Sequence, residues 1–465
     1  MSDAPVPQPA PTAPPLHHIG EDDSSKAGSP PRHRRGVTAE PGEGEDASLL
    51  ATFRRATRNA LWLLLSQGGV RLLSFAVGTL LARSLGAADF GTYAFVMTYT
   101  SYFGILADAG LGRFLIRDVA RDRAVADAYL GQITALRLTL AAVAYALMLV
   151  LALATRSTPE RLVAIAVAGA SLFTGAVAGA LASVFTAREE MHIAALFTLL
   201  SSVATTLFVL AALAAGAGVM GTVTAVTLAN LPPLLFLLAV WRRREPLPHP
   251  RASLPFWWRA LRSSYAYALL GALGVVYFRI DSLMLTWMRG PEANGIYQAA
   301  YRLLDAVTDA PGVIVAAMFP ALARLHVGPR ATLRRAYLTV LAVLAALGLP
   351  VMVALLAFAG PIVHLLYGAE YARSAEVLRL LAVAVFLIFV DTANTMLLYS
   401  GDELGKVLVL SVGTTAANVL LNLILIPRYS YNGAAVATIA STALSLLIFT
   451  PTVLRYLVRE RASSS

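Results

Sequence analysis

Several charged residues of this sequence lie inside apolar stretches, where a charge is costly. Arg71 falls near the middle of the first such stretch, on a polar stripe that Gln67 begins. Arg302, Asp305 and Asp309 share one face of a later stretch. A charge at the centre of a membrane helix costs about 2.5–3.5 kcal/mol on insertion scales, so such residues face a partner helix or a water-filled cavity. Guanidinium groups there bind anions, and carboxylates bind cations or protons.

Each of these charges also has a structural interpretation. Arg71 either pairs with a carboxylate on a neighbouring helix or meets an anionic substrate, and the sequence leaves both open. Arg302 and Asp305 are spaced to neutralise each other. Asp309 lies two residues before Pro311, whose ring frees backbone carbonyls that bind cations. Asp309 is therefore the first candidate for ion coupling, and Asp305 is the second.

Two further charges lie close together in a third stretch. Arg279 and Asp281 are two residues apart, about 200° around a helix, so they cannot face the same cavity. We place Arg279 towards a cavity and Asp281 in a pair between helices. Asp108 is expected to end a helix and to pair with Arg113. Other candidates within apolar stretches are Gln67, Arg137, Asn394 and Asn418 for substrate binding, and the lone carboxylate of Asp391 for ion coupling.

The elements that must hold these residues are membrane helices. Hydrophobic residues make up 57% of the 465 residues, and 14% are charged, against about 25% in soluble domains. The mean hydropathy is +0.67. Windows of roughly 20 apolar residues occur at 59–82, 92–112, 130–154, 162–186, 193–215, 220–241, 265–288, 297–320, 336–358, 376–399, 405–426 and 433–456. The sequence predicts an all-α integral membrane protein with about 12 transmembrane helices.

A motif that occurs twice indicates an internal duplication. Gly86-Ala-Ala-Asp-Phe-Gly91-Thr-Tyr93 separates the first two windows, and Gly290-Pro-Glu-Ala-Asn-Gly295-Ile-Tyr297 separates the seventh from the eighth. Repeats in transporters frame a site near the middle of the bilayer, so we expect two pseudo-symmetric six-helix lobes around a central cavity. The predicted parts are a disordered cytoplasmic tail at 1–52, an N-terminal lobe at 53–246, a basic linker at 247–264, and a C-terminal lobe with a short tail at 265–465.

Positive charge is concentrated in alternate connections between the windows. Residues 113–123 and 242–262 are rich in arginine, whereas the intervening connections carry few cations. The positive-inside rule then predicts that both termini are cytoplasmic, and residues 1–52 lack the features of a signal peptide. The net charge of +10 follows from this topology, so nucleic-acid binding is not expected. Without cysteines or the motifs of nucleotide-binding proteins, serine hydrolases or zinc proteases, the sequence does not predict an enzyme.

Five motifs, in order, resemble those of the polysaccharide transporter family. They are residues 85–93, 107–113, 277–281, 295–302 and 431–438, and the resemblance spans roughly residues 55 to 460. The family contains Wzx-type O-antigen and exopolysaccharide flippases, in the superfamily that also holds MATE exporters and the lipid II flippase. Many relatives, including the lipid II flippase, have fourteen spans. The smaller span count here favours the sugar-specific branch.

The resemblance implies a V-shaped pair of lobes in the bacterial cytoplasmic (inner) membrane. By alternating access they would carry a polyprenyl-diphosphate-linked oligosaccharide to the outer leaflet, with Arg71, Arg279 and Arg302 mapping by type and depth onto arginines that attract the diphosphate. No cofactor is implied beyond an H+ or Na+ gradient. Expected partners are membrane lipids and polysaccharide polymerase or assembly machinery, with the protein itself a monomer. The alternatives are a MATE-like ion-coupled drug or cation antiporter with an acidic cavity, a membrane glycan polymerase or ligase, and an envelope-assembly scaffold.

Overall fold

The computed structural model describes residues 43–122, 125–246, 252–308, 328–401 and 404–458, with a few residues between 311 and 326 and with side chains from Gly68 onward. Residues up to Arg55 form a unit of their own, and the rest of α1 and all later helices belong to the unit that begins at Ala56. The helices are α1 (Glu43–Asp108), α2 (Leu111–Arg121), α3 (Ala126–Ala154), α4 (Pro159–Gly169), α5 (Ser171–Ala187), α6 (Met191–Ala214), α7 (Gly218–Leu228), α8 (Leu231–Arg242), α9 (Leu254–Arg289), α10 (Pro291–Thr308), α12 (Arg330–Tyr367), η2 (Ala369–Tyr371), α13 (Ser374–Ser400) and α14 (Leu404–Val458).

Nine helical stretches in these ranges are long and apolar enough to cross a membrane. This confirms the predicted class, an all-helical, multi-pass integral membrane protein. Two of the stretches, Gly68–Arg121 and Gly405–Val458, have 54 residues each, which is more than twice what one crossing needs. Each contains a break in its helical backbone, at Gly86 in α1 and at Ser430 in α14. Both breaks fall between two of the predicted windows.

The break in α1 shows why its position carries glycine. Gly86 has φ 75° and ψ 171°, and Gly290, between α9 and α10, has φ 87° and ψ 170°. This region of backbone conformation is open almost only to glycine. The first residue of the duplicated motif thus makes the same turn in both copies, immediately before a helix. α1 also begins within the segment predicted as a tail, and α9 begins within the predicted linker, where Pro255 occupies its first turn.

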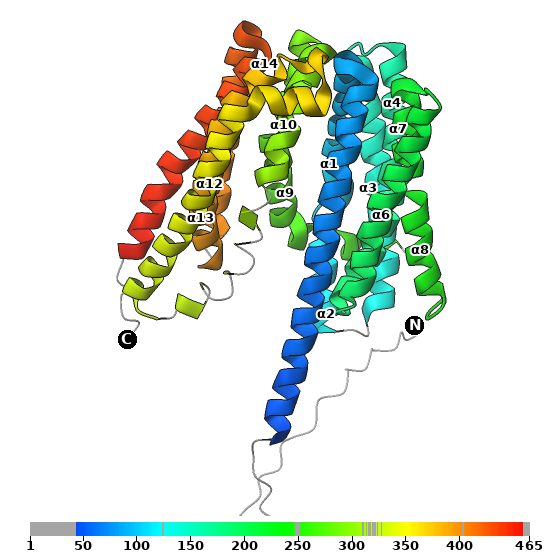
Figure 1. The fold of residues 1–465 in the computed structure, drawn as a ribbon. Helices are drawn as coiled ribbons and strands as arrows, with labels where there is room; N and C mark the ends of the chain where they lie inside the picture. The colour runs from blue at the N-terminus through cyan, green and yellow to red at the C-terminus, as the bar shows by residue number, and fades with distance from the viewer. Residues whose placement is uncertain are drawn as a thin grey trace, which may run out of the picture. The chain divides into compact units, whose positions relative to one another are not determined.

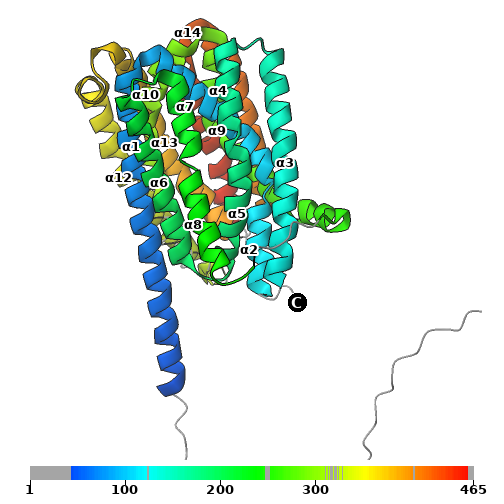
Figure 2. The same cartoon turned by 90° about the vertical axis from the view of Figure 1, so that its right-hand side faces the viewer.

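The helices pack in two groups, one from each half of the chain. α12, α13 and α14 pack together in the second half of the chain, and α3 to α8 contact one another in the first half (Figure 1). α9 joins the two, because it packs against α14 and also against α2 and α3. Figure 2 shows α4, α7 and α10 towards one end of the helices and α2 and α8 towards the other. We call the α2 and α8 end the arginine-rich end, since arginines follow or lie within both helices.

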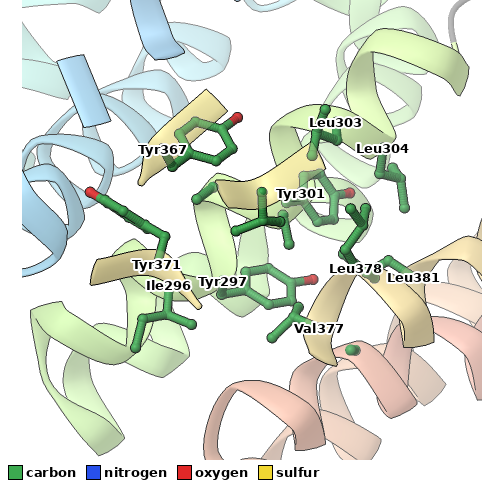
Figure 3. Packing of buried hydrophobic residues seen from close by; sticks show 14 of the residues in the cluster. Ile296, Tyr297, Tyr301, Leu303, Leu304, Tyr367, Tyr371, Val377, Leu378 and Leu381 are labelled. Carbon is green, nitrogen blue, oxygen red and sulfur yellow. The ribbon is translucent and has the colours of Figure 1, made fainter. Parts of the chain in front are cut away.

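The largest buried cluster contains side chains from both halves. It includes Leu81 and Phe90 of α1 together with Tyr297 and Tyr301 of α10. Figure 3 shows Tyr297 and Tyr301 among Ile296, Leu378 and Leu381, close to Tyr367 and Tyr371. The cluster therefore lies around the second copy of the duplicated motif and joins α1 to α10.

Candidate functional site

Three of the predicted arginines line one cavity between the halves. Arg71 comes from α1, Arg279 from α9 and Arg302 from α10, and the cavity has a volume of about 550 Å³. Ser74 of α1, with Gln298 and Asp305 of α10, completes its polar lining. We call this cavity the arginine chamber. Among its described lining residues three arginines face one aspartate, so its wall is cationic.

Arg302 reaches across the chamber to the other half. One of its terminal nitrogens donates to the backbone carbonyl of Ser74 at 2.7 Å. A methyl group at Gly78 would overlap the Arg302 guanidinium, which explains why this position of α1 is glycine. The Arg302 Nε is buried without a hydrogen-bond partner. The guanidinium thus has an unused donor within the chamber wall.

Arg279 and Asp305 form an ion pair at 2.9 Å, with both side chains 37% exposed. Arg279 also lies over the Tyr301 ring, 5.5 Å from its centre. The sequence offered Arg302, one turn away on the same helix, as one partner for Asp305. In the structure Asp305 binds the arginine of the neighbouring helix, because Arg302 extends towards α1 instead.

Asp281 lies on the other side of α9, away from the arginine chamber, as its angular separation from Arg279 predicted. It is 3% exposed and accepts hydrogen bonds from the Tyr297 hydroxyl and from the Ser282 backbone nitrogen. Ser282 in turn donates to Asn294 at 2.9 Å. The predicted link between helices is therefore present, with tyrosine as the partner.

The two copies of the duplicated motif touch each other at the end opposite the arginine-rich end. Asn294 donates to the Gly91 carbonyl at 3.0 Å. A methyl group at Gly91 would lie 2.7 Å from the Gly295 nitrogen, and one at Gly295 would lie 2.8 Å from the Ala87 carbonyl carbon. Both glycines are thus required for this close backbone approach. We call these mutual contacts of residues 87–91 and 291–295 the motif contact.

A third segment closes over the motif contact. The Glu370 carboxylate accepts from the Ala87 backbone nitrogen at 2.7 Å, and the Tyr371 hydroxyl donates to the Ala82 carbonyl at 2.8 Å. Both residues belong to η2, which follows Gly368. Gly368 has a φ of 86°, close to that of Gly86 and Gly290. The carboxylate satisfies a backbone donor at the start of a helix, which is where an anion is favoured.

Comparison with known proteins decides the family. A sequence model of the family described as "Polysaccharide biosynthesis protein" matches residues 56–326, more than half of the chain. The chain belongs to this family. No curated protein matches the sequence.

The fold is similar to that of several solved transporters. The structure of "Lipid II flippase MurJ, inward closed conformation" has a TM-score of 0.67 and 12% identity, over 85% of this chain and 87% of that one. An inward-facing multidrug resistance MATE family transporter has a TM-score of 0.61 and 16% identity, over 87% and 96%. A MOP superfamily transporter from Pyrococcus furiosus, described as having a binding pocket of reverse polarity, has a TM-score of 0.57 and 16% identity, over the same 87% and 96%. At these identities the likeness shows the fold alone.

Other predicted site residues lie away from the arginine chamber. Asn394 accepts from the Tyr337 hydroxyl and donates to Thr450, and Asn418 donates to Ser441, so both amides link helices of the second half. Asp391 accepts from Ser445 at 2.7 Å and lines a smaller cavity of about 220 Å³. Asp309 lies outside the described residues, and so does the side chain of Gln67.

Asp108 pairs with a different arginine from the one that the sequence suggested. Asp108 was expected to pair with Arg113, but it forms an ion pair with Arg137, whose side chain is 4% exposed. Arg113 lies over the Tyr267 ring, 5.6 Å from its centre. Helix packing brings α3 next to the end of α1, and spacing along the sequence does not show this.

Sequence reasoning missed two residues of this region. Gln298 lines the arginine chamber, and Glu370 holds the start of the helix after Gly86. Gln298 lies four residues before Arg302, on the same helical face, so its position gave a usable signal. The segment Gly368-Ala-Glu370-Tyr371 repeats the opening Gly-Ala of the first motif copy, and this repeat could have identified Glu370.

Proposed function

We propose that this protein flips a polyprenyl-diphosphate-linked oligosaccharide across the bacterial cytoplasmic membrane by alternating access, for surface polysaccharide biosynthesis. In this proposal about 12 transmembrane helices form two six-helix lobes around a central cavity, and both termini are cytoplasmic. The observation that carries the proposal is the arginine chamber, where Arg71, Arg279 and Arg302 from three helices converge. Family membership supports the polysaccharide pathway.

The chemistry of such a substrate suits the chamber. A diphosphate cannot cross a hydrocarbon layer of about 30 Å unaided, since burying its charge in hydrocarbon is prohibitive. Guanidinium groups offer paired donors that match phosphate oxygens, and they stay charged at every physiological pH. Arg302 retains a buried donor without a partner, and the Arg279–Asp305 pair is partly exposed to the chamber. A phosphate that displaces Asp305 would thus meet a guanidinium already held in place.

The alternatives are less well supported by the same residues. A cation or drug antiporter needs acidic groups in its cavity, whereas the described chamber lining has one carboxylate, and that carboxylate is ion-paired. A glycan polymerase or ligase and an assembly scaffold remain the other two hypotheses. For the driving force we propose an H+ or Na+ gradient, with Asp305 and Asp391 as the described candidates for the coupling site.

The test is glycan export in a strain that lacks the gene. The strain is complemented with wild type, Arg302→Gln, Arg279→Gln or the control Arg334→Gln, which changes an exposed arginine of α12. The lipid-linked precursor and the surface glycan are quantified by mass spectrometry, and the variants are checked for membrane insertion. We expect the precursor to accumulate without the gene and with both chamber variants, and to clear with Arg334→Gln. Normal export without the gene would refute the proposal.

A further inference from the structure

A second cavity lies inside the first half of the chain, apart from the arginine chamber. Its volume is about 350 Å³. This lies near the lower end of the roughly 300–1,000 Å³ of small-molecule sites, so the cavity suits one small ring rather than a whole oligosaccharide. Its polar lining includes Thr100, Ser101, Asp108, Arg137, Ser171 and Asn230. We call it the inner cavity.

Two residues that line the inner cavity each carry a polar atom that lacks a partner. The Thr100 hydroxyl and the Arg137 Nε are both buried without a hydrogen bond. Thr100 is 7% exposed and Arg137 is 3% exposed. A buried polar group without a partner destabilises the fold, so such groups are rare unless a ligand or water completes them. Two of them around one cavity indicate a site for a polar ligand.

The other hydroxyls of the lining restrict what that ligand can be. Ser101 donates to the Thr98 carbonyl at 2.7 Å, and Ser171 donates to the Ala168 carbonyl at 2.6 Å. Both serine hydroxyls therefore already donate to a backbone carbonyl three residues earlier, and towards a ligand they can only accept hydrogen bonds. Thr100 and the Arg137 Nε add donors. A ligand that satisfies this lining must carry several groups that both donate and accept, as the hydroxyls of a sugar do.

Charge excludes the other obvious ligands. Asp108 and Arg137 are ion-paired in the wall of the inner cavity, so the pair has no net charge. A cationic ligand would meet Arg137, and an anionic one would meet Asp108. Either would have to break a pair whose arginine is almost wholly buried, which is costly. The wall therefore favours a neutral ligand.

The inner cavity adjoins the space between the halves. A larger cavity of about 770 Å³ shares Ser101, Gly104 and Asp108 with it and is also lined by α9. The turn after Asp108 is tightly fixed, because Ala109 and Gly110 have positive φ and a methyl at Gly110 would lie 2.7 Å from the Ser264 carbonyl oxygen of α9. Asp108 is thereby held at the boundary of the two cavities.

We propose that the inner cavity is a saccharide subsite, which holds one neutral sugar ring of the glycan while the diphosphate occupies the arginine chamber. This rests on the proposed function. Val275, which lines the larger cavity, and Arg279, which lines the arginine chamber, lie one turn apart on α9. These four residues of helix rise by about 6 Å, so a glycosyl diphosphate can extend from the chamber towards the inner cavity.

The experiment uses the full-length protein in lipid nanodiscs with two separate probes. Geranyl diphosphate tests the arginine chamber by calorimetry, and the methyl glycosides of neutral hexoses and N-acetylhexosamines test the inner cavity by saturation-transfer NMR. Gly175→Leu fills the inner cavity, since a methyl group at Gly175 meets no atom within 4 Å. Its matched control is Gly413→Leu on α14, where a methyl group also meets nothing. Thr100→Val removes the unused hydroxyl, and Thr222→Val is its control, because the buried Thr222 already donates to Gly218.

We expect at least one glycoside to bind wild type and both controls, to lose binding to Gly175→Leu, and to bind Thr100→Val about 3- to 10-fold more weakly, while geranyl diphosphate binds all five proteins equally. If geranyl diphosphate binds but no glycoside does, or if the glycosides bind Gly175→Leu normally, the saccharide subsite is refuted and the proposed function stands. If the glycosides bind as expected and geranyl diphosphate does not bind, the proposed function fails and the subsite remains. Displacement of the glycosides by tetramethylammonium would identify a cation site and refute the subsite.

Discussion

Replacing Gly91 by alanine should separate the two copies of the duplicated motif. In an open helical position this change stabilises a helix by about 1 kcal/mol. At Gly91 the new methyl group would lie 2.7 Å from the Gly295 nitrogen and nearer still to the Pro291 carbonyl oxygen, whereas ordinary contacts begin at 3.4 Å. Both neighbours are backbone atoms, so the helices must move apart by on the order of 1 Å. Overpacking of this kind costs about 1–3 kcal/mol, which exceeds the gain from helix propensity.

That cost acts only on the state in which the motif contact is closed. A shift of about 1–3 kcal/mol between two states changes their ratio by roughly 5- to 150-fold. The chain has no cysteine, so a single Ala293→Cys, at a position 8% exposed in the motif contact, reports the opening cleanly. The assay is the rate of labelling by a membrane-impermeant maleimide, with Gly413→Ala as control. Unchanged labelling in a folded Gly91→Ala protein would show that the motif contact does not hold the halves together.

Three further predictions concern single contacts. Gly78→Ala should displace the Arg302 guanidinium and reduce glycan export, whereas Gly413→Ala on α14, where a methyl group meets open space, should leave export unchanged. Asp108→Asn should lower the free energy of unfolding by about 1–3 kcal/mol, because it leaves the buried Arg137 charge without its partner. The double variant Asp108→Asn with Arg137→Met should recover part of this lost stability, as measured by thermal unfolding. Hydrogen bonds from Arg188 hold the pKa of Glu245 below its ordinary 4.5. This pair therefore stabilises the fold above pH 4.5 and loses its contribution as the pH falls through the lowered pKa, so Glu245→Gln should flatten the fall of Tm with acid, and an unchanged profile would contradict the role of the pair.

The helical class, and the choice of these arginines as residues that avoid lipid, could be predicted because both depend on properties local in sequence. Apolar windows give membrane helices, and the cost of a buried charge implies that Arg71, Arg279 and Arg302 avoid lipid. In the structure the three arginines line one cavity, and which helices bring them there is not visible in the sequence. The glycines of the motif gave the positions of two turns, since their backbone conformation is open almost only to glycine.

Partners across helices could not be predicted, because they depend on how each helix is rotated and on which helix lies beside it. Asp305 pairs with Arg279 and not with Arg302, and Asp108 pairs with Arg137 and not with Arg113. In both cases the sequence offered a partner within two turns, and packing supplied a nearer one. Nearby charges in a sequence are therefore a weak guide to pairing inside a membrane protein.

The arginine chamber and the motif contact share one helix, and this suggests how a substrate would act on both. Gly295 and Arg302 lie two turns apart on α10, and both contact α1, at Ala87 and at Ser74. A ligand shifts a conformational equilibrium only through different contacts in the two states. Arg302 provides such a difference, because in this state its terminal nitrogen is bound to Ser74, and a phosphate would compete for it. Arg302→Ala should therefore increase labelling of Ala293→Cys without any substrate. If labelling stays at the level of the unsubstituted Arg302 protein, the Arg302–Ser74 bond does not hold α10 against α1, and the motif contact alone keeps this end closed.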